Sequence, residues 1–168
     1  MARKLRGIEQ IKFSPDELTR IVAWMTRLTA AEDGWINLVP RLSDDDDDDD
    51  ERPTSLGFFA LLGGGAIGIT MGTWIPPSHH PRRGLVWPSL GISQVTGRRA
   101  VAELNSLALP VPETWRIEQD HPRRGLILRL PPGEAPEKVL AWALRAVALC
   151  TYRPIATWRA DVHLPAKP

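Results

Sequence analysis

Cysteine is nearly absent from this sequence, with Cys150 as the single example in 168 residues. The chain can therefore form no intramolecular disulfide, and no zinc site can be built from its cysteines. Cys150 ends an apolar pattern of helical spacing, so we expect a buried structural thiol rather than a reactive one. No apolar segment of the secretory type follows the basic N-terminal residues, which favours a cytoplasmic protein.

Motifs of known catalytic chemistry are also missing. No G-x-S-x-G elbow occurs, and Ser89 and Ser93 have no assignable histidine and aspartate partners. Glu118 and Asp120 alternate onto one face of a predicted strand and could form a catalytic carboxylate pair, but solvent-facing strand positions commonly carry such charges. The sequence therefore favours a non-enzymatic protein, and it predicts no catalytic residue and no cofactor.

Lysine and tyrosine are scarce compared with the chemically similar arginine and tryptophan. The chain has 4 lysines against 17 arginines, and arginine presents a planar fork that suits phosphate and carboxylate groups. A gene rich in G and C would produce the same bias, so both explanations stay open. Tyrosine occurs once against 7 tryptophans, which indicates that several tryptophans are large anchors in the core or at an interface.

One stretch occurs twice, and the two copies lie 41 residues apart. Thr73-Trp74 is followed after five residues by His80-Pro81-Arg82-Arg83-Gly84, and Thr114-Trp115 is followed after the same gap by His121-Pro122-Arg123-Arg124-Gly125. A fainter third echo begins at Thr157-Trp158. Each main copy predicts a hairpin, because apolar residues flank a proline that cannot donate to a ladder and a glycine that permits a positive φ.

Each predicted hairpin leads into a predicted helix. Thr96 could cap a helix over residues 97–104, and Pro136 suits the first turn of a second helix. The sequence therefore predicts a duplicated hairpin–helix unit in which Gly84 and Gly125 occupy matching positions. On that basis, replacing either glycine by alanine should destabilise the protein by a similar amount.

The remaining patterns complete the predicted fold. Residues 14–17 have the form of a capping box that starts a helix ending near Ala31, and residues 35–39 should be a short strand that a proline ends. Residues 155–163 alternate as a last strand. We therefore expect one domain over residues 1–168, of class α+β, with a mostly antiparallel sheet and about three helices packed chiefly on one face.

An acidic run divides the charge of the chain. Residues 44–51 are seven aspartates and a glutamate, and without these eight charges the formal net charge rises from +1 to +9. Neighbouring aspartates repel one another and resist burial, so residues 43–55 should be a flexible, solvated loop. The ligand spacing of an EF-hand is missing, so we expect no specific metal site there. An alternative role is electrostatic, in which the run screens the chain's own arginines.

Residues 56–75 contain no charge over a length that could cross a bilayer. Gly64, Gly68 and Gly72 fall on the G-x-x-x-G spacing that paired helices use in lipid. Acidic residues precede the stretch and arginines follow it, which also fits a membrane span whose C-terminal end lies on the cytoplasmic side. Three consecutive glycines are poor in a helix interior, however, and suit the turn of a hairpin. We favour buried strands and keep a membrane span as the alternative.

The arginines beside the predicted turns are the candidate binding residues. Two adjacent arginines at a turn cannot both point inward, and residues 96–99 at a predicted helix start could cradle a phosphate or carboxylate. The turn histidines could hold a metal ion only if they met, and we expect exposed turn histidines instead. The predicted anion- or partner-binding residues are Arg82, Arg83, Arg98, Arg99, Arg123, Arg124, His80 and His121.

These features predict a non-enzymatic interaction module that engages an acidic protein surface or a phosphate-bearing ligand through arginine-rich turns and exposed aromatic residues. Nucleic-acid binding is the first alternative, because arginine contacts phosphates and tryptophan stacks on bases. Affinity for non-specific DNA or RNA should then fall steeply with salt. A single-span membrane anchor over residues 56–75 is the second alternative, and an enzyme of unrecognised type is the third.

Overall fold

The computed structural model of this protein describes residues 7–42, 70–93 and 97–164. Within these ranges lie the helices α1 (Thr19–Ala31), α3 (Ala100–Ser106) and α4 (Pro136–Thr151). The strands are β1 (Ile8–Phe13), β2 (Trp35–Leu42), β3 (Met71–Ile75), β4 (Ser78–His80), β5 (Gly84–Val86), β6 (Ser89–Ser93), β7 (Arg116–His121), β8 (Gly125–Arg129) and β9 (Ile155–His163).

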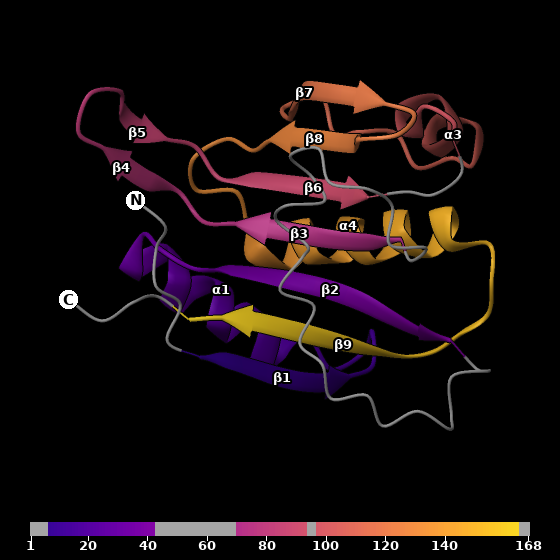
Figure 1. The fold of residues 1–168 in the computed structure, drawn as a ribbon, viewed down its shortest axis with the longest axis horizontal. Helices are drawn as coiled ribbons and strands as arrows, with labels where there is room; N and C mark the ends of the chain where they lie inside the picture. Colours follow the sequence, from indigo (N-terminus) through magenta and orange to yellow (C-terminus); the bar gives the residue numbers. More distant parts are fainter. Residues whose placement is uncertain (1–6, 43–69, 94–96, 165–168) are drawn as a thin grey trace.

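Seven of these strands form one sheet, called the main sheet below, in the order β1-β9-β2-β3-β6-β8-β7 (Figure 1). Every neighbouring pair in it is antiparallel. β4 and β5 pair with each other in a separate two-stranded antiparallel sheet, which extends from one end of the molecule. The predicted α+β class, with a mostly antiparallel sheet and about three helices, is confirmed.

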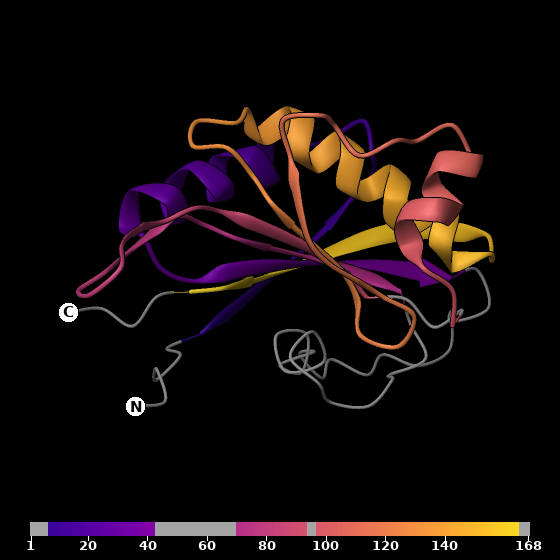
Figure 2. The ribbon, with the colours of Figure 1, turned by 90° about the horizontal axis from the view of Figure 1, so that it is seen from above.

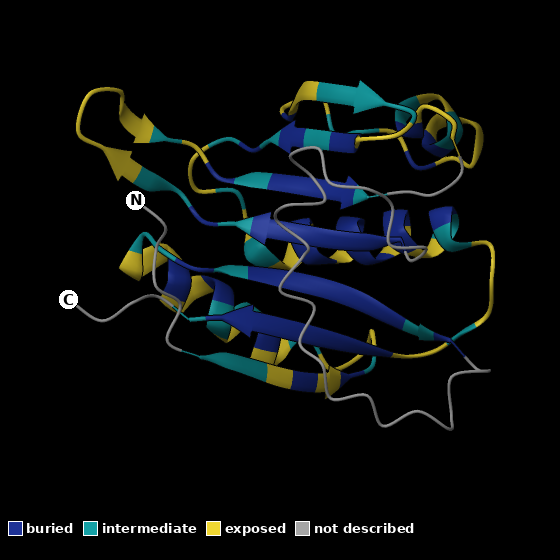
Figure 3. Cartoon of the chain, in the orientation of Figure 1, coloured by how far each residue is buried: buried dark blue, intermediate teal, exposed yellow. Residues whose placement is uncertain are grey.

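The core lies between one face of the main sheet and the helices. α1 and α4 cover that face, as Figure 2 shows, and α3 packs beside α4. Side chains at alternate strand positions point toward the helices, because successive residues of a strand face opposite sides. Figure 3 shows the resulting burial along the central strands and the exposure of the two-stranded sheet. The buried strand residues of this face include Ile36, Leu38, Trp74, Leu90, Ile92, Leu126 and Leu128.

The first helix begins later than the capping-box pattern predicts. α1 starts at Thr19 and has no side-chain cap. The carbonyl oxygen of Ser14 instead accepts a hydrogen bond from the backbone N–H of Glu17 at 2.9 Å, in a turn that follows β1. β1 is an edge strand that the sequence analysis did not predict. Its last residue, Phe13, is buried and pairs with Trp158 in β9, so the backbone is still extended immediately before Ser14.

β2 is longer than predicted, because it runs through Pro40 to Leu42. Proline has no N–H to donate, so strands tolerate it where one side lacks a partner. The pairing of β2 with β3 ends at Leu38, opposite Gly72, whereas its pairing with β9 continues to Leu42. Beyond Leu38, β2 has one described neighbour, and Pro40 is accommodated within the strand.

α3 begins at Ala100 instead of the predicted Gly97. Gly97 has a φ of 69°, which lies outside the helical range. The carboxylate of Asp120, near the end of β7, accepts a hydrogen bond from the backbone N–H of Ala100 at 2.9 Å. The helix is therefore capped by a residue from a distant strand. Thr96, the predicted cap, lies outside the described residues.

The structure does not confirm a duplicated hairpin–helix unit. Trp74 lies within β3, whereas Trp115 lies in a turn before β7. After the first hairpin the chain adds β6, which was not predicted and which pairs with β3, before it reaches α3. After the second hairpin, α4 is the next element. The β7–β8 hairpin also forms the edge of the main sheet, with a register shift between Ile117 and Gln119.

Two stretches that stand out in the sequence lie wholly or partly outside the described residues. These are the acidic loop, 43–55, and residues 56–69 of the uncharged stretch. Met71–Ile75, at the end of the uncharged stretch, forms β3 in the middle of the main sheet, in agreement with the strand interpretation. Among the residues that the structure describes, no helix is long and apolar enough to cross a membrane.

Candidate functional site

The two histidine–arginine turns contain the same hydrogen bond from a backbone N–H to the histidine ring. His80 pairs with Gly84 across the first turn, and His121 pairs with Gly125 across the second. Nδ1 of His80 accepts a hydrogen bond from the backbone N–H of Arg82 at 3.2 Å, and the equivalent bond in the second turn is 3.1 Å long. The two glycines have φ values of 70° and 80°, so the predicted positive φ is confirmed at both positions.

The turn histidines thus have a structural contact of their own. Because Nδ1 of each ring accepts a backbone N–H, only Nε2 faces other partners. His80 is exposed and His121 is half-buried. Within residues 7–42, 70–93 and 97–164, no group of three or more histidine, cysteine or acidic side chains is placed to hold a metal ion.

The two turns differ in their surroundings. A side chain added at Gly84 would meet no atom within 4 Å, whereas one added at Gly125 would collide with the carbonyl oxygen of Ile92 in β6. The first turn therefore stands free, and the second is packed against the main sheet. We call β4, its turn and β5 the arm (residues 78–86), which projects beyond the main sheet in Figure 1.

The root of the arm is tied to the body of the protein. Pro76 and Pro77 precede it, Pro88 follows it, and two of these prolines, Pro76 and Pro88, are buried. One carboxylate oxygen of Glu32, directly after α1, accepts the backbone N–H of His79 at 3.2 Å, and the other lies 2.6 Å from Nδ1 of the same histidine. The fixed φ of proline and this two-point contact restrict the arm at its root.

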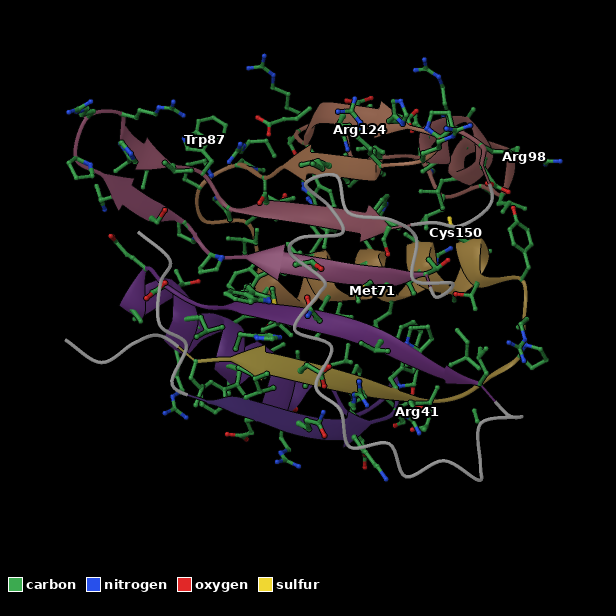
Figure 4. The ribbon with its side chains drawn as sticks, in the orientation of Figure 1. Arg41, Met71, Trp87, Arg98, Arg124 and Cys150 are labelled. Atoms are coloured by element: carbon green, nitrogen blue, oxygen red, sulfur yellow. The ribbon has the colours of Figure 1, made fainter. Side chains whose placement is uncertain are left out.

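Exposed apolar side chains accompany the arginines of the arm. Arg82 and Arg83 are exposed in the turn, and Leu85 and Trp87 on the returning side are 46% and 45% exposed. Figure 4 shows Trp87 beside the base of the arm. Its backbone oxygen accepts a hydrogen bond from Arg129 of β8 at 2.9 Å, so the main sheet holds this residue in place.

The other four candidate arginines lie away from the arm. Arg98 and Arg99 precede α3, and the β7–β8 turn contains the remaining two. The guanidinium of Arg99 donates to the backbone oxygen of Asp120 at 3.3 Å. Figure 4 shows Arg98 at the end of the molecule opposite the arm. The structure therefore does not bring all six arginines together. In the predicted phosphate cradle at the start of α3, the backbone N–H of Ala100 is already bound by Asp120.

A cavity of about 250 Å³ lies between α1 and the start of α4. Pro77 and Pro88, where the chain enters and leaves the arm, line one part of it. Trp74 lines it from β3, and Met25 and Val139 line it from the two helices. The cavity was not predicted, because its lining comes from segments that are far apart in the sequence.

Glu134 is the ionisable residue of the cavity lining. Its carboxylate accepts the indole N–H of Trp115 at 2.6 Å and the ammonium group of Lys138 at 3.0 Å. Burial acts to raise the pKa of this carboxyl, but the hydrogen bonds from Trp115 and Lys138 outweigh burial and lower the pKa below its ordinary value. Glu134 is therefore an ionised group that already has its partners.

Buried polar side chains cross the other face of the main sheet. Ile36 and Leu38 face the helices, so Asn37 between them points to the opposite side. The hydroxyl of Thr73 donates to Oδ1 of Asn37 at 2.9 Å, and Nδ2 of Asn37 lies 3.2 Å from Nε2 of His163. These three polar residues are at most 1% exposed. We call them, with the neighbouring ion pair of Arg159 and Asp161 on β9, the polar cluster.

The contact with Asn37 indicates where a neutral His163 ring carries its proton. Oδ1 of Asn37 already accepts the Thr73 hydroxyl, so its amide nitrogen is the group that faces the imidazole and donates to Nε2. A neutral imidazole that accepts at Nε2 carries its proton on Nδ1. Burial lowers the pKa of His163, and the charge of Asp161 acts in the opposite direction. The ring of Trp35 also stacks on this imidazole, with centroids 4.3 Å apart.

Sequence reasoning missed the polar cluster, although a signal was present. Arg159, Asp161 and His163 occupy every second position of a strand that was predicted correctly, so one face of that strand is entirely polar there. Such alternation is typical of a solvated strand face, so the pattern by itself predicts exposure. All three are nevertheless buried, which the local pattern does not predict.

Cys150 is buried, as expected. Burial raises the pKa of its thiol to about 11, and the nearby charge of Glu103 acts in the same direction. A thiol with this pKa is protonated at neutral pH, which agrees with a structural role.

The candidate regions differ in what a partner could reach. The three linked residues of the polar cluster are at most 1% exposed, whereas the arm presents cationic and apolar side chains to solvent. No known protein family, curated protein or solved structure matches this chain. Of these two regions, the arm is therefore the one that a partner can reach.

Proposed function

We propose that this protein is a non-enzymatic interaction module that binds an acidic protein surface through the arm. The observation that carries the proposal is the joint exposure of Arg82, Arg83, Leu85 and Trp87 on or beside a projecting two-stranded arm. Arginine and tryptophan are enriched among the residues that dominate the binding energy of protein interfaces. Two cations with apolar neighbours suit an acidic surface that also has apolar residues.

The construction of the arm also supports binding. Ordering a flexible loop on association costs free energy, and a segment that is already ordered avoids much of that cost. The arm is paired along β4 and β5, and Glu32 and the flanking prolines restrict its root. An arm that is ordered before binding can therefore present its arginines at little entropic cost.

A protein partner suits the arm better than nucleic acid does. Affinity for the DNA backbone grows with the number of phosphates that are neutralised, and a protein with about 6–10 phosphate contacts binds in a strongly salt-dependent way. The arm carries two arginines, and Arg98 is at the opposite end of the molecule. A short cationic arm of this kind fits a small group of carboxylates on a protein surface.

The two turns provide a matched pair of variants for testing the proposal. One variant carries Arg82→Glu with Arg83→Glu, and the control carries Arg123→Glu with Arg124→Glu, so both make the same charge change in the same local sequence. Binding is measured at low salt to immobilised polyglutamate and, separately, to duplex DNA. We expect the arm variant to lose affinity for polyglutamate by roughly tenfold or more and the control to lose clearly less.

The same measurements can reject the proposal. An equal loss in both variants would mean that total charge, rather than the arm, determines binding. Tighter binding to duplex DNA than to polyglutamate, with a steep dependence on salt, would instead identify a nucleic-acid-binding protein.

A further inference from the structure

The arm and the cavity share the same piece of chain. Pro77 directly precedes β4 and Pro88 lies shortly after β5, and both line the cavity of about 250 Å³. Each strand of the arm has three residues, so the tip lies on the order of 10 Å from the root. About three or four residues of extended peptide cover that distance.

The size of the cavity indicates a single side chain as its occupant. A cavity of about 150 Å³ is enough to hold benzene, whereas pockets for drug-sized ligands commonly measure about 300–1,000 Å³. At about 250 Å³ this cavity lies between those limits. Beneath it, the core lined by Ile21, Leu38 and Leu90 leaves only about 10 Å³, so the floor is closed.

The chemistry of the lining indicates that the occupant is apolar. Met25, Trp74, Leu130 and Val139 contribute apolar surface. The one carboxylate of the lining, on Glu134, already accepts hydrogen bonds from a tryptophan and a lysine. A charged ligand group placed in the cavity would therefore find no free counter-charge, which burial makes unfavourable.

We infer that the cavity receives one large apolar side chain from the acidic partner, about three or four residues along the partner chain from the carboxylates that meet Arg82 and Arg83. This inference rests on the proposed function and specifies the partner segment further: an apolar anchor followed or preceded by acidic residues. The carboxylates of the partner bind the arginines of the arm, and the apolar anchor fills the cavity at the root of the arm.

The cavity is tested first by itself, with indole as the probe and ligand-observed NMR as the measurement. Thr29 is an exposed residue of α1 that lines the cavity, so Thr29→Phe should fill the space without disturbing the core. Ala30→Phe is the matched control, because Ala30 is also exposed on α1 and is not part of the lining. We expect Thr29→Phe to weaken indole binding by at least about tenfold and Ala30→Phe to leave it unchanged.

The partner segment is tested with two synthetic peptides. One has two glutamates, a three-residue Gly/Ser spacer and a phenylalanine, and the other has serine in place of phenylalanine. The phenylalanine peptide should bind the wild-type protein about tenfold more tightly, and Thr29→Phe should remove that difference. Arg82→Glu with Arg83→Glu should weaken both peptides and leave indole binding unchanged.

The two proposals fail in different ways. If indole does not bind the wild-type protein, or binds Thr29→Phe equally well, the cavity inference is wrong, whatever the peptides do. If indole binds as expected but the arm substitutions leave both peptides unaffected, the acidic-partner proposal is wrong. Equal affinity of the two peptides for the wild-type protein would also overturn the inferred apolar anchor.

Discussion

The hydroxyl of Thr73 on β3 and the imidazole of His163 on β9 are linked through the amide of Asn37 on the strand between them. Each hydrogen bond in this series orients the next group, so reversing one amide would reverse the whole series. All three side chains are buried, and water does not supply an easy alternative partner.

Acid should destabilise the protein in a window set by His163. The folded-state pKa of His163 is lowered below its ordinary value of 6.5, so just below pH 6.5 the unfolded chain binds a proton that the folded chain does not. The stability contributed by this group is therefore complete above about pH 6.5 and is lost as the pH falls toward the folded-state pKa. Chemical denaturation in steps from pH 8 to pH 5 measures the effect.

The source of this pH dependence is identified with paired substitutions. His163→Gln removes the titrating ring and should flatten the change in unfolding free energy below pH 6.5. His80→Gln makes the same substitution in the exposed turn of the arm and should keep most of the wild-type dependence. Asp161 favours the charged form of the ring, so its effect is included in the lowered pKa. If both variants keep the wild-type profile, His163 is not the responsible group.

Removing the Thr73 hydroxyl should change the imidazole two strands away. Thr73→Val keeps the side-chain shape and removes the donor to Asn37, which should reduce the unfolding free energy by about 1–3 kcal/mol. The freed amide can then turn its oxygen toward His163, which raises the imidazole pKa and moves the proton to Nε2. NMR of the imidazole nitrogens reports this change directly.

Thr70→Val is the matched control for that experiment. Thr70 is also buried, but its hydroxyl donates to the backbone oxygen of Cys150 at 3.1 Å. This variant should lose stability by a similar amount and leave the nitrogen signals of His163 unchanged. Equal signals in all three proteins would contradict the proposed series of hydrogen bonds.

Gly84→Ala and Gly125→Ala should not be equivalent, contrary to the expectation from the repeat. Both glycines have a positive φ, which costs a side chain about 1–2 kcal/mol. At Gly84 the new methyl group meets no atom within 4 Å. The loss of stability there should therefore equal the cost of the positive φ. At Gly125 it collides with the carbonyl oxygen of Ile92, and we expect a loss of about 3 kcal/mol or more. Thermal and chemical denaturation of both variants decide the point.

Trp115→Ala should be among the most destabilising single substitutions. Trp115 is 4% exposed and meets Trp142 edge-to-face with centroids 5.3 Å apart, and its N–H binds the carboxylate of Glu134. Truncation should cost about 3–5 kcal/mol. Trp87→Ala, at a 45% exposed position, should cost about 0.5 kcal/mol or less. Similar losses of unfolding free energy in the two variants would show that the exposed fraction of a tryptophan does not predict its contribution to stability.

Elements that depend on neighbours in the sequence were predictable from it. The β7–β8 hairpin follows from apolar alternation around a proline and a glycine, and α4 follows from an apolar stripe that begins after Pro136. β9 likewise follows from period-two alternation. In each case the residues that specify the element are part of the element.

Features that depend on distant partners were not predictable. Asp120 sets the start of α3, and the limited pairing of β2 explains why Pro40 stays within a strand. The cavity and the polar cluster also need segments that only the fold brings together. The candidate arginines were identified by local sequence, but their division between the arm and the α3 end reflects where each hairpin joins the sheet. The free turn and the packed turn have the same five residues, His-Pro-Arg-Arg-Gly, so sequence could not distinguish them.

The position of β9 between β1 and β2 constrains when the protein can fold during synthesis. Among the described strands, β1 pairs only with β9, from Ile8 opposite His163 to Phe13 opposite Trp158. Ribosomes add about 5–20 residues per second, so β1 waits on the order of ten seconds before its partner has been made. During that time β1 has no partner strand, so its backbone and its apolar side chains stay accessible to chaperones. The pairing of β1 can therefore form only after β9 has been synthesised.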